Sequence, residues 1–84
     1  MSDDQFYIDA GRRLRELRER GLNETPAQFA KRFGLTVRDY LAYEEGRRSR
    51  GWTRHIDAIA DTGVSLDWLF DTHASRAMFR PTTA

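Results

Sequence analysis

The sequence has no cysteine, only two prolines and only two histidines among 84 residues. Without cysteine there can be no disulfide, no thiolate zinc ligand and no catalytic thiol. Long apolar runs are also missing, since the longest unbroken run covers the four residues from Tyr40 to Tyr43. A membrane-spanning helix needs about 20 such residues and the core of a signal peptide about 7–15. We therefore expect a cytoplasmic protein with no membrane partner.

The residues that usually carry catalysis are equally scarce. His55 and His73 lie 18 positions apart, so their spacing predicts no metal site. Glu44 and Glu45 are neighbours on a predicted helix and point about 100° apart, which does not suit a pair of converging catalytic carboxylates. The sequence also has no glycine-rich phosphate-binding loop. We expect no enzymatic activity, no metal, no cofactor and no small-molecule ligand.

Positive charge is abundant but concentrated in one part of the chain. The formal net charge is only +1, yet residues 31–54 hold seven basic and three acidic side chains, for a net charge of +4. Thirteen of the 14 basic residues are arginine, whose planar guanidinium suits phosphate groups and the edge of guanine. The charge distribution therefore favours a nucleic-acid partner for this 24-residue window.

The chain length suits one small domain, and the sequence pattern predicts that it is all-helical. Apolar residues recur at helical spacing from Phe6 to Leu17, and Gly21 ends this first helix. A second helix begins after Thr25 with a capping box to Gln28, and buries a stripe of Phe29, Ala30 and Phe33. Three further helices are predicted at Val37–Glu45, from Trp52 or Thr53 to Gly63 with Ile56, Ile59 and Ala60 buried, and at Leu66–Phe70.

The second and third predicted helices are joined by only three residues, which is typical of a helix-turn-helix unit. On a helical wheel, Tyr40 and Tyr43 point to the core, whereas Val37, Arg38, Leu41 and Ala42 face outward. In the major groove of DNA, arginine binds guanine and apolar side chains contact the thymine methyl group. The same outward residues could instead contact a protein partner, or be scattered surface apolar residues.

The chain resembles the Cro and lambda-repressor-like (XRE-type) helix-turn-helix regulators over about residues 5–71. The residues that carry the resemblance, in the order and nearly the spacing of that family, are Gly11-Arg12-Arg13-Leu14-Arg15-Glu16-Leu17-Arg18, Gln28-Phe29-Ala30-Lys31-Arg32-Phe33-Gly34-Leu35-Thr36, Tyr40, Tyr43-Glu44-Glu45-Gly46-Arg47-Arg48 and Gly63-Val64-Ser65-Leu66-Asp67-Trp68-Leu69. The resemblance implies a compact five-helix lambda-repressor-like domain over residues 1–71, with residues 72–84 as a tail.

By the same resemblance, the third helix lies in the major groove and an arginine late in helix one pairs with a glutamate late in helix three, here Arg18 and Glu44. The expected base-reading residues are Thr36, Val37, Arg38, Leu41 and Ala42. The expected phosphate-binding residues are Thr25, Gln28, Arg47, Arg48, Arg50 and Arg54.

Three features depart from the family pattern. Pro26 stands where the family usually has a glutamine that contacts phosphate, the turn before the second helix is about one residue longer, and Trp52 lies near a usual proline. We expect Trp52 to pack in the core or over the loop, although it could also stack on a sugar.

Proteins of this type gain affinity by binding a two-fold operator as dimers. We therefore expect a homodimer whose interface includes Leu66, Leu69, Phe70, Met78 and Phe79, unless the fifth helix only closes the core and the tail is disordered. The sequence thus predicts a DNA-binding transcriptional regulator, a repressor or autoregulator similar to those of phages and mobile elements. The alternative is an antitoxin-like or anti-activator protein that acts mainly by binding another protein.

Overall fold

The computed structural model describes residues 3–47, 52–70 and 77–80, and within them the protein is an all-α domain of five helices. This confirms the predicted fold class. A π-helical turn, η1, directly continues the first helix. The elements, in chain order, are α1 (Asp3–Glu16), η1 (Leu17–Gly21), α2 (Pro26–Arg32), α3 (Val37–Glu44), α4 (Trp52–Ala60) and α5 (Leu66–Phe70).

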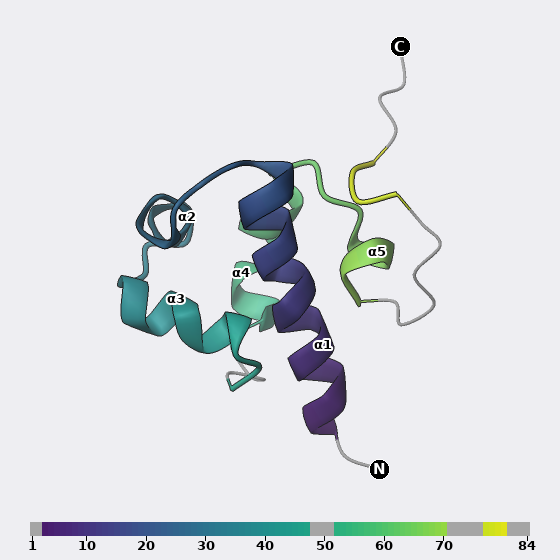
Figure 1. Ribbon diagram of the computed structural model, residues 1–84, viewed down its shortest axis with the longest axis horizontal. Helices are drawn as coiled ribbons and strands as arrows, with labels where there is room; N and C mark the ends of the chain where they lie inside the picture. The colour runs from purple at the N-terminus through teal and green to yellow at the C-terminus, as the bar shows by residue number, and fades with distance from the viewer. Residues whose placement is uncertain (1–2, 48–51, 71–76, 81–84) are drawn as a thin grey trace.

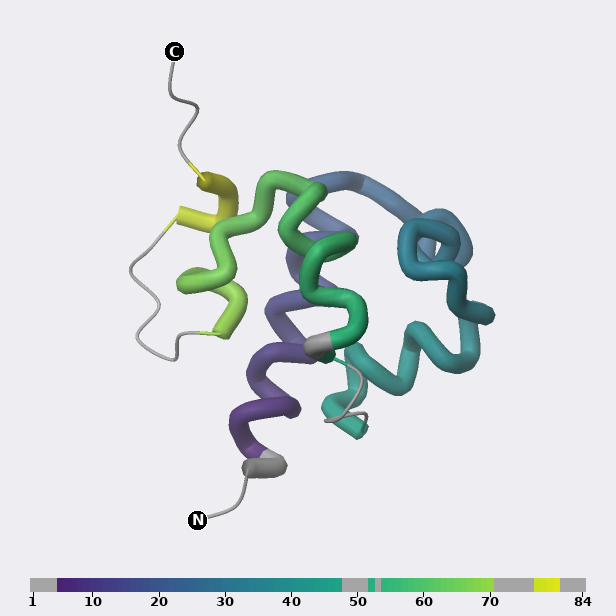
Figure 2. Tube along the Cα trace, turned by 180° about the vertical axis from the view of Figure 1, so that it is seen from behind, coloured from purple at the N-terminus to yellow at the C-terminus, as the bar shows by residue number. Residues whose placement is uncertain are grey.

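Helix α1 is the central element, and the other helices are arranged on opposite sides of it (Figure 1). Helices α2 and α3 lie on one side, while α5 and the segment 77–80 lie on the other. The reverse view shows the same division, with α4 in front of the C-terminal half of α1 (Figure 2). The domain therefore presents the α2–α3 unit on one side and its C-terminal elements on the far side.

All five helices and η1 contribute buried side chains to the core. The side chains that are buried in it are those of Ala10, Leu14, Leu17, Phe29, Ala30, Tyr40, Tyr43, Trp52, Ile59, Val64, Trp68 and Leu69. The predicted burial is wrong for three residues. Phe33, which follows α2, is half-buried, as are Ile56 and Ala60 on α4, where Trp52 and Ile59 are the buried side chains. Phe6 is 41% exposed near the start of α1, where it contacts Tyr7 and the ring of Phe70.

Two glycines let α1 and α3 approach each other closely. A Cβ atom on Gly11 would lie 2.6 Å from the carbonyl oxygen of Glu44, so the two backbones are nearly in contact there. Gly46 ends α3 with φ +77°, a backbone conformation that favours glycine, and its Cα lies against the backbone of Ile8. The end of α3 is thus fixed against the first half of α1.

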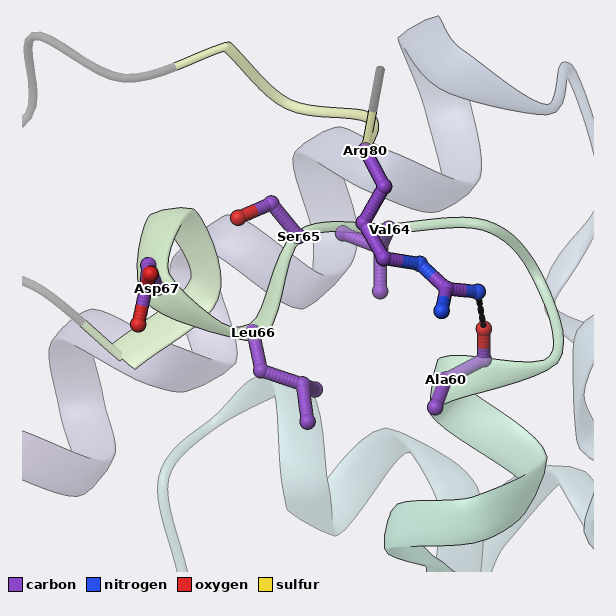
Figure 3. A pocket seen from close by; sticks show the side chains of 6 residues that line it. All are labelled: Ala60, Val64, Ser65, Leu66, Asp67 and Arg80. Carbon is purple, nitrogen blue, oxygen red and sulfur yellow. Dashed lines mark hydrogen bonds between the residues drawn. The ribbon is translucent and has the colours of Figure 1, made fainter. Parts of the chain in front are cut away.

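The segment 77–80 is packed on the domain. The Ser65 N–H donates to the Met78 carbonyl (2.7 Å), and the Arg80 N–H donates to the Gly63 carbonyl (2.8 Å). The Arg80 guanidinium also donates to the Ala60 carbonyl at 2.8 Å, beside a cavity of about 210 Å³ at the start of α5 (Figure 3). Residues 77–80 therefore belong to the folded unit, although the sequence predicted a separate tail for them. The other residues of that predicted tail, 72–76 and 81–84, lie outside the described part of the chain.

Candidate nucleic-acid interface

Helices α2 and α3 form a helix-turn-helix unit with well-defined ends. Helix α2 begins with the predicted capping box, in which Thr25 Oγ1 accepts from the Gln28 N–H (3.1 Å) and Gln28 Oε1 accepts from the Thr25 N–H (2.8 Å). Helix α3 begins at Thr36, whose Oγ1 accepts from the Asp39 N–H at 3.1 Å. Both helices therefore start where the sequence predicted, on local side-chain hydrogen bonds.

Aromatic rings fix the angle between these two helices. The rings of Phe29 and Tyr40 meet edge-to-face with centroids 5.3 Å apart, and Phe33 stacks on Tyr40 at 5.9 Å. Phe29 and Tyr40 are both 0% exposed. Such contacts between desolvated rings hold the inner side of α3 against α2 and leave its opposite side free.

The first turn of α3 carries the exposed part of the predicted base-reading set. Thr36, Val37 and Arg38 are all exposed, Val37 by 39%, while Tyr40 and Tyr43 point inward at 0% and 4%. Among the described residues, Arg38 has no ion-pair partner. The outward and inward sides of α3 are therefore those that the helical wheel predicted.

Leu41 and Ala42 are less accessible than the sequence indicated. Both are half-buried, and Leu41 packs against the core. Leu41 also lines a surface groove between α1 and α3, together with Arg15, Arg18, Glu44 and Glu45. The wheel counted Leu41 as outward, but the side chains of α1 and η1 cover part of it. At the second turn of α3, the exposed surface available for reading bases is therefore smaller than the sequence predicted.

Arg18 and Glu44 form a buried ion pair between η1 and α3. Arg18 Nε lies 2.6 Å from Glu44 Oε2, and each side chain is only 7% exposed. Arg18 Nη1 also donates to the Glu24 carbonyl at 3.0 Å, and the Tyr40 hydroxyl donates to the Glu44 carboxylate. The hydrogen bond to Glu44 raises the pKa of Arg18, and burial raises the pKa of Tyr40. This network joins α3 to the end of the first helix.

The residues predicted to bind phosphate occupy different surroundings. Thr25 and Gln28 are exposed at the start of α2, with the Gln28 oxygen held by the capping box. Arg54 is exposed on α4 and has no ion-pair partner within the described ranges. Arg47 is exposed and pairs with Glu45. Arg48 and Arg50 lie outside the described residues.

The structure adds one exposed cation to this side of the domain. Lys31 lies on α2, three residues after Gln28, and has no ion-pair partner in the part of the chain that is described. Its neighbour Arg32 is different, because it makes a two-pronged pair with Glu24, with Nε 3.0 Å from Oε1. The basic character of residues 31–54 indicated both, but sequence spacing could not tell which one was free.

The predicted dimer interface is partly inside the core. Leu69 is 0% exposed and cannot contact a second chain in this conformation, so that assignment is wrong. Phe70 is half-buried between Phe6 and Trp52. Leu66, Met78 and Phe79 are also half-buried, with Met78 and Phe79 beside Gly21.

Trp52 is a core residue, as the sequence predicted. It is 3% exposed and its ring meets those of Tyr43 and Phe70 edge-to-face, with centroids 5.4 and 5.6 Å apart. Its indole Nε1 is buried, and no group among the described residues accepts a hydrogen bond from it. Trp52 therefore ties the start of α4 to α3 and α5, and it is not accessible for stacking on a sugar.

Comparison of the chain with protein-family models, with curated proteins and with solved structures found no match. None of the described helices combines the length and apolar character that crossing a bilayer requires. Within the same residues, no three histidine, aspartate or glutamate side chains come together as ligands for a metal ion.

Proposed function

We propose that this protein is a helix-turn-helix DNA-binding protein, and specifically a transcriptional regulator, a repressor or autoregulator of the XRE type. The observation that carries the proposal is the first turn of α3. There, Val37 and the unpaired Arg38 are exposed, while Tyr40 and Phe29 hold the opposite side rigidly in the core. A rigid helix with an exposed arginine and an adjacent aliphatic side chain suits the major groove.

In this mechanism, the first turn of α3 reads base edges and the surrounding cations bind phosphates. Arg38 donates two hydrogen bonds to a guanine, and the methyl groups of Val37 contact a neighbouring thymine. Lys31 on α2 and Arg54 on α4 are exposed and have no ion-pair partner in the described part of the chain, and each phosphate contact they make adds affinity that depends on salt. By occupying an operator, the protein would block transcription from the overlapping promoter.

A homodimer is part of the proposal, because one helix in the groove reads only a few base pairs. Helix α5 and the segment 77–80 lie on the side of α1 opposite to α2 and α3 (Figure 1). A second copy bound to the half-buried Leu66 and Phe70 would leave both α3 helices free for DNA. A two-fold operator would then place its half-sites about 34 Å apart.

The second candidate function is that of an antitoxin-like or anti-activator protein. The observation that favours it is the apolar character of the outward side of α3, where Val37 is 39% exposed beside the half-buried Leu41 and Ala42. A partner protein could cover this strip. Such an apolar contact would depend little on salt, whereas DNA binding weakens steeply as salt rises.

The decisive experiment is the selection of bound duplexes from a random pool, followed by a salt titration on the enriched sequence. We expect a palindromic consensus and a linear fall of log affinity with log salt, with a slope set by the number of phosphates contacted. Failure to enrich any sequence, together with binding that is insensitive to salt, would favour the protein-binding alternative.

The variant Arg38→Ala tests the base-reading assignment. We expect it to weaken binding to the selected duplex by about 1–3 kcal/mol and to relax the preference at one base pair, which we expect to contain guanine. Binding of random DNA should change much less. The measurement is a pair of titrations, on selected and on random duplex. An equal loss on both would make Arg38 a phosphate contact instead.

Gln28 allows helix capping and DNA contact to be separated. The capping box holds Oε1, so the Gln28 amide N–H groups point away from Thr25 and are free to donate to a phosphate. Gln28→Glu keeps the acceptor for the Thr25 N–H but removes the donor and adds negative charge. We expect thermal stability to be kept and DNA affinity to fall by about tenfold at low salt.

Gln28→Ala is the matched control for that substitution. It should lower stability by about 0.5–1.5 kcal/mol, because the Thr25 N–H loses its acceptor while Thr25 Oγ1 still accepts from the backbone N–H of residue 28. It should also weaken DNA binding less than Gln28→Glu. If both variants bind DNA as tightly as the original protein, Gln28 must be removed from the set of phosphate contacts.

A further inference from the structure

Glu45 is a carboxylate in an unfavourable place for both folding and DNA binding. It is the C-cap residue of α3, and a negative charge there opposes the helix dipole. The side chain of Glu45 is 54% exposed and lies at the end of α3, where it lines the groove between α1 and α3 together with Leu41. An exposed acidic side chain at this end of α3 should repel a phosphate that approaches Arg47.

The partner of Glu45 is one of the cations predicted to bind phosphate. Arg47 Nη2 donates to Glu45 Oε1, and the side chains are 72% and 54% exposed, respectively. Such an exposed pair is weak, so it adds little to the stability of the fold. A phosphate brought close to Arg47 would therefore compete with Glu45 for the same guanidinium group.

We propose that Glu45 sets the affinity of the domain for DNA by competing with phosphate for Arg47. This inference rests on the proposed function. It adds that Glu45 lowers the affinity of the domain for DNA of any sequence. With no DNA bound, the guanidinium group of Arg47 is held by the carboxylate two residues away. Binding of DNA must break that pair, and this cost is the same for any sequence, because Arg47 meets phosphate and not a base.

The test is a double-mutant cycle of Glu45→Gln and Arg47→Ala, measured on a selected and on a random duplex at several salt concentrations. Glu45→Gln alone should tighten binding to both duplexes equally, by about two- to fivefold at low salt, and steepen the salt dependence by up to about one unit. In the Arg47→Ala background, Glu45→Gln should give no such gain. The melting temperature should stay unchanged or rise slightly, because the unfavourable charge at the helix end is removed.

Asp61→Asn is the control for net charge. Asp61 is exposed directly after Ala60, the last residue of α4, and its substitution changes the net charge by the same amount as Glu45→Gln. Three results would overturn the inference. In the first, Glu45→Gln changes DNA affinity no more than Asp61→Asn does. In the second, Glu45→Gln gives the same gain in affinity in the Arg47→Ala background. In the third, Glu45→Gln weakens binding to the selected duplex and leaves binding to the random duplex unchanged. The last result would mean that Glu45 reads a base, such as cytosine.

The cycle also separates this inference from the proposed function. If the unmodified protein shows no salt-dependent binding to any duplex, the proposed function fails and the inference fails with it. If the unmodified protein binds DNA and Glu45→Gln changes nothing beyond the charge control, only the role of Glu45 is rejected.

Discussion

Gly11→Ala is expected to destabilise the protein by about 3 kcal/mol or more, which is a large part of the total stability of an 84-residue domain. The added Cβ would lie 2.6 Å from the carbonyl oxygen of Glu44 and would also meet that of Tyr43. Both atoms belong to backbone at the end of α3, so they cannot rotate away as a side chain could. Helices α1 and α3 would have to separate, and chemical or thermal unfolding followed by circular dichroism measures the loss.

Gly34→Ala is the matched control for this prediction. Gly34 has φ +66°, but a Cβ there would meet no atom within 4 Å. The expected cost is therefore only that of the left-handed backbone conformation, about 1–2 kcal/mol. If the two variants unfold at the same denaturant concentration, the close contact between α1 and α3 at Gly11 does not exist in solution.

Glu44→Ala is expected to cost about 3–5 kcal/mol of folding free energy, because it leaves the buried Arg18 without its carboxylate. Arg18 is 6% exposed and cannot regain full hydration, and the Tyr40 hydroxyl loses its acceptor in the same substitution. The measurement is equilibrium unfolding in denaturant. Since α3 also loses its tie to the end of the first helix, DNA affinity should fall together with stability.

Glu19→Ala provides the control, because Glu19 contacts the same guanidinium group at 3.4 Å but is 46% exposed. Its removal should cost about 1 kcal/mol or less. Replacing both partners, as Arg18→Met with Glu44→Leu, should recover much of the stability that Glu44→Ala loses. Equal losses for Glu19→Ala and Glu44→Ala would show that the buried pair is hydrated in solution.

The helix boundaries could be predicted because they depend on short-range chemistry. Thr25 and Thr36 cap α2 and α3 with their own side chains, and Gly46 ends α3 in a left-handed conformation. The inward direction of Tyr40 and Tyr43 follows from helical periodicity alone. In each case the residues that decide the outcome are within about four positions of one another.

Burial was predicted less well, because it depends on segments that are distant in the sequence. An apolar residue such as Leu69 can belong either to a core or to an interface, and the sequence alone does not distinguish the two. The structure shows that Leu69 belongs to the core, where α5 packs against α1. The docking of residues 77–80 depends on backbone hydrogen bonds of Met78 with Ser65, 13 residues earlier, and of Arg80 with Gly63, 17 residues earlier. Backbone groups have no sequence signature. Leu41 was assigned to the outward side because a helical wheel does not include the neighbouring helix.

The candidate site shows the same division. The exposed positions of Val37 and Arg38 follow from the wheel, but the pairing of Arg18 with Glu44, 26 residues later, was indicated only by resemblance to a family. Which arginines are free was beyond prediction. Arg32 and Arg47 carry the same guanidinium group as Arg38. Only the structure shows that Arg32 forms an ion pair with Glu24 and that Arg47 forms one with Glu45.

The π-helical turn η1 accommodates one more residue than an α-helical turn would. The Leu22 N–H donates to the Leu17 carbonyl, five residues back, at 2.9 Å. The widened turn leaves Leu17 in the core and Arg18 opposite Glu44. A single-residue deletion between Gly21 and Glu24 could then be absorbed by rewinding this turn to an ordinary helix. Length variation at this point would leave the orientation of α3 unchanged.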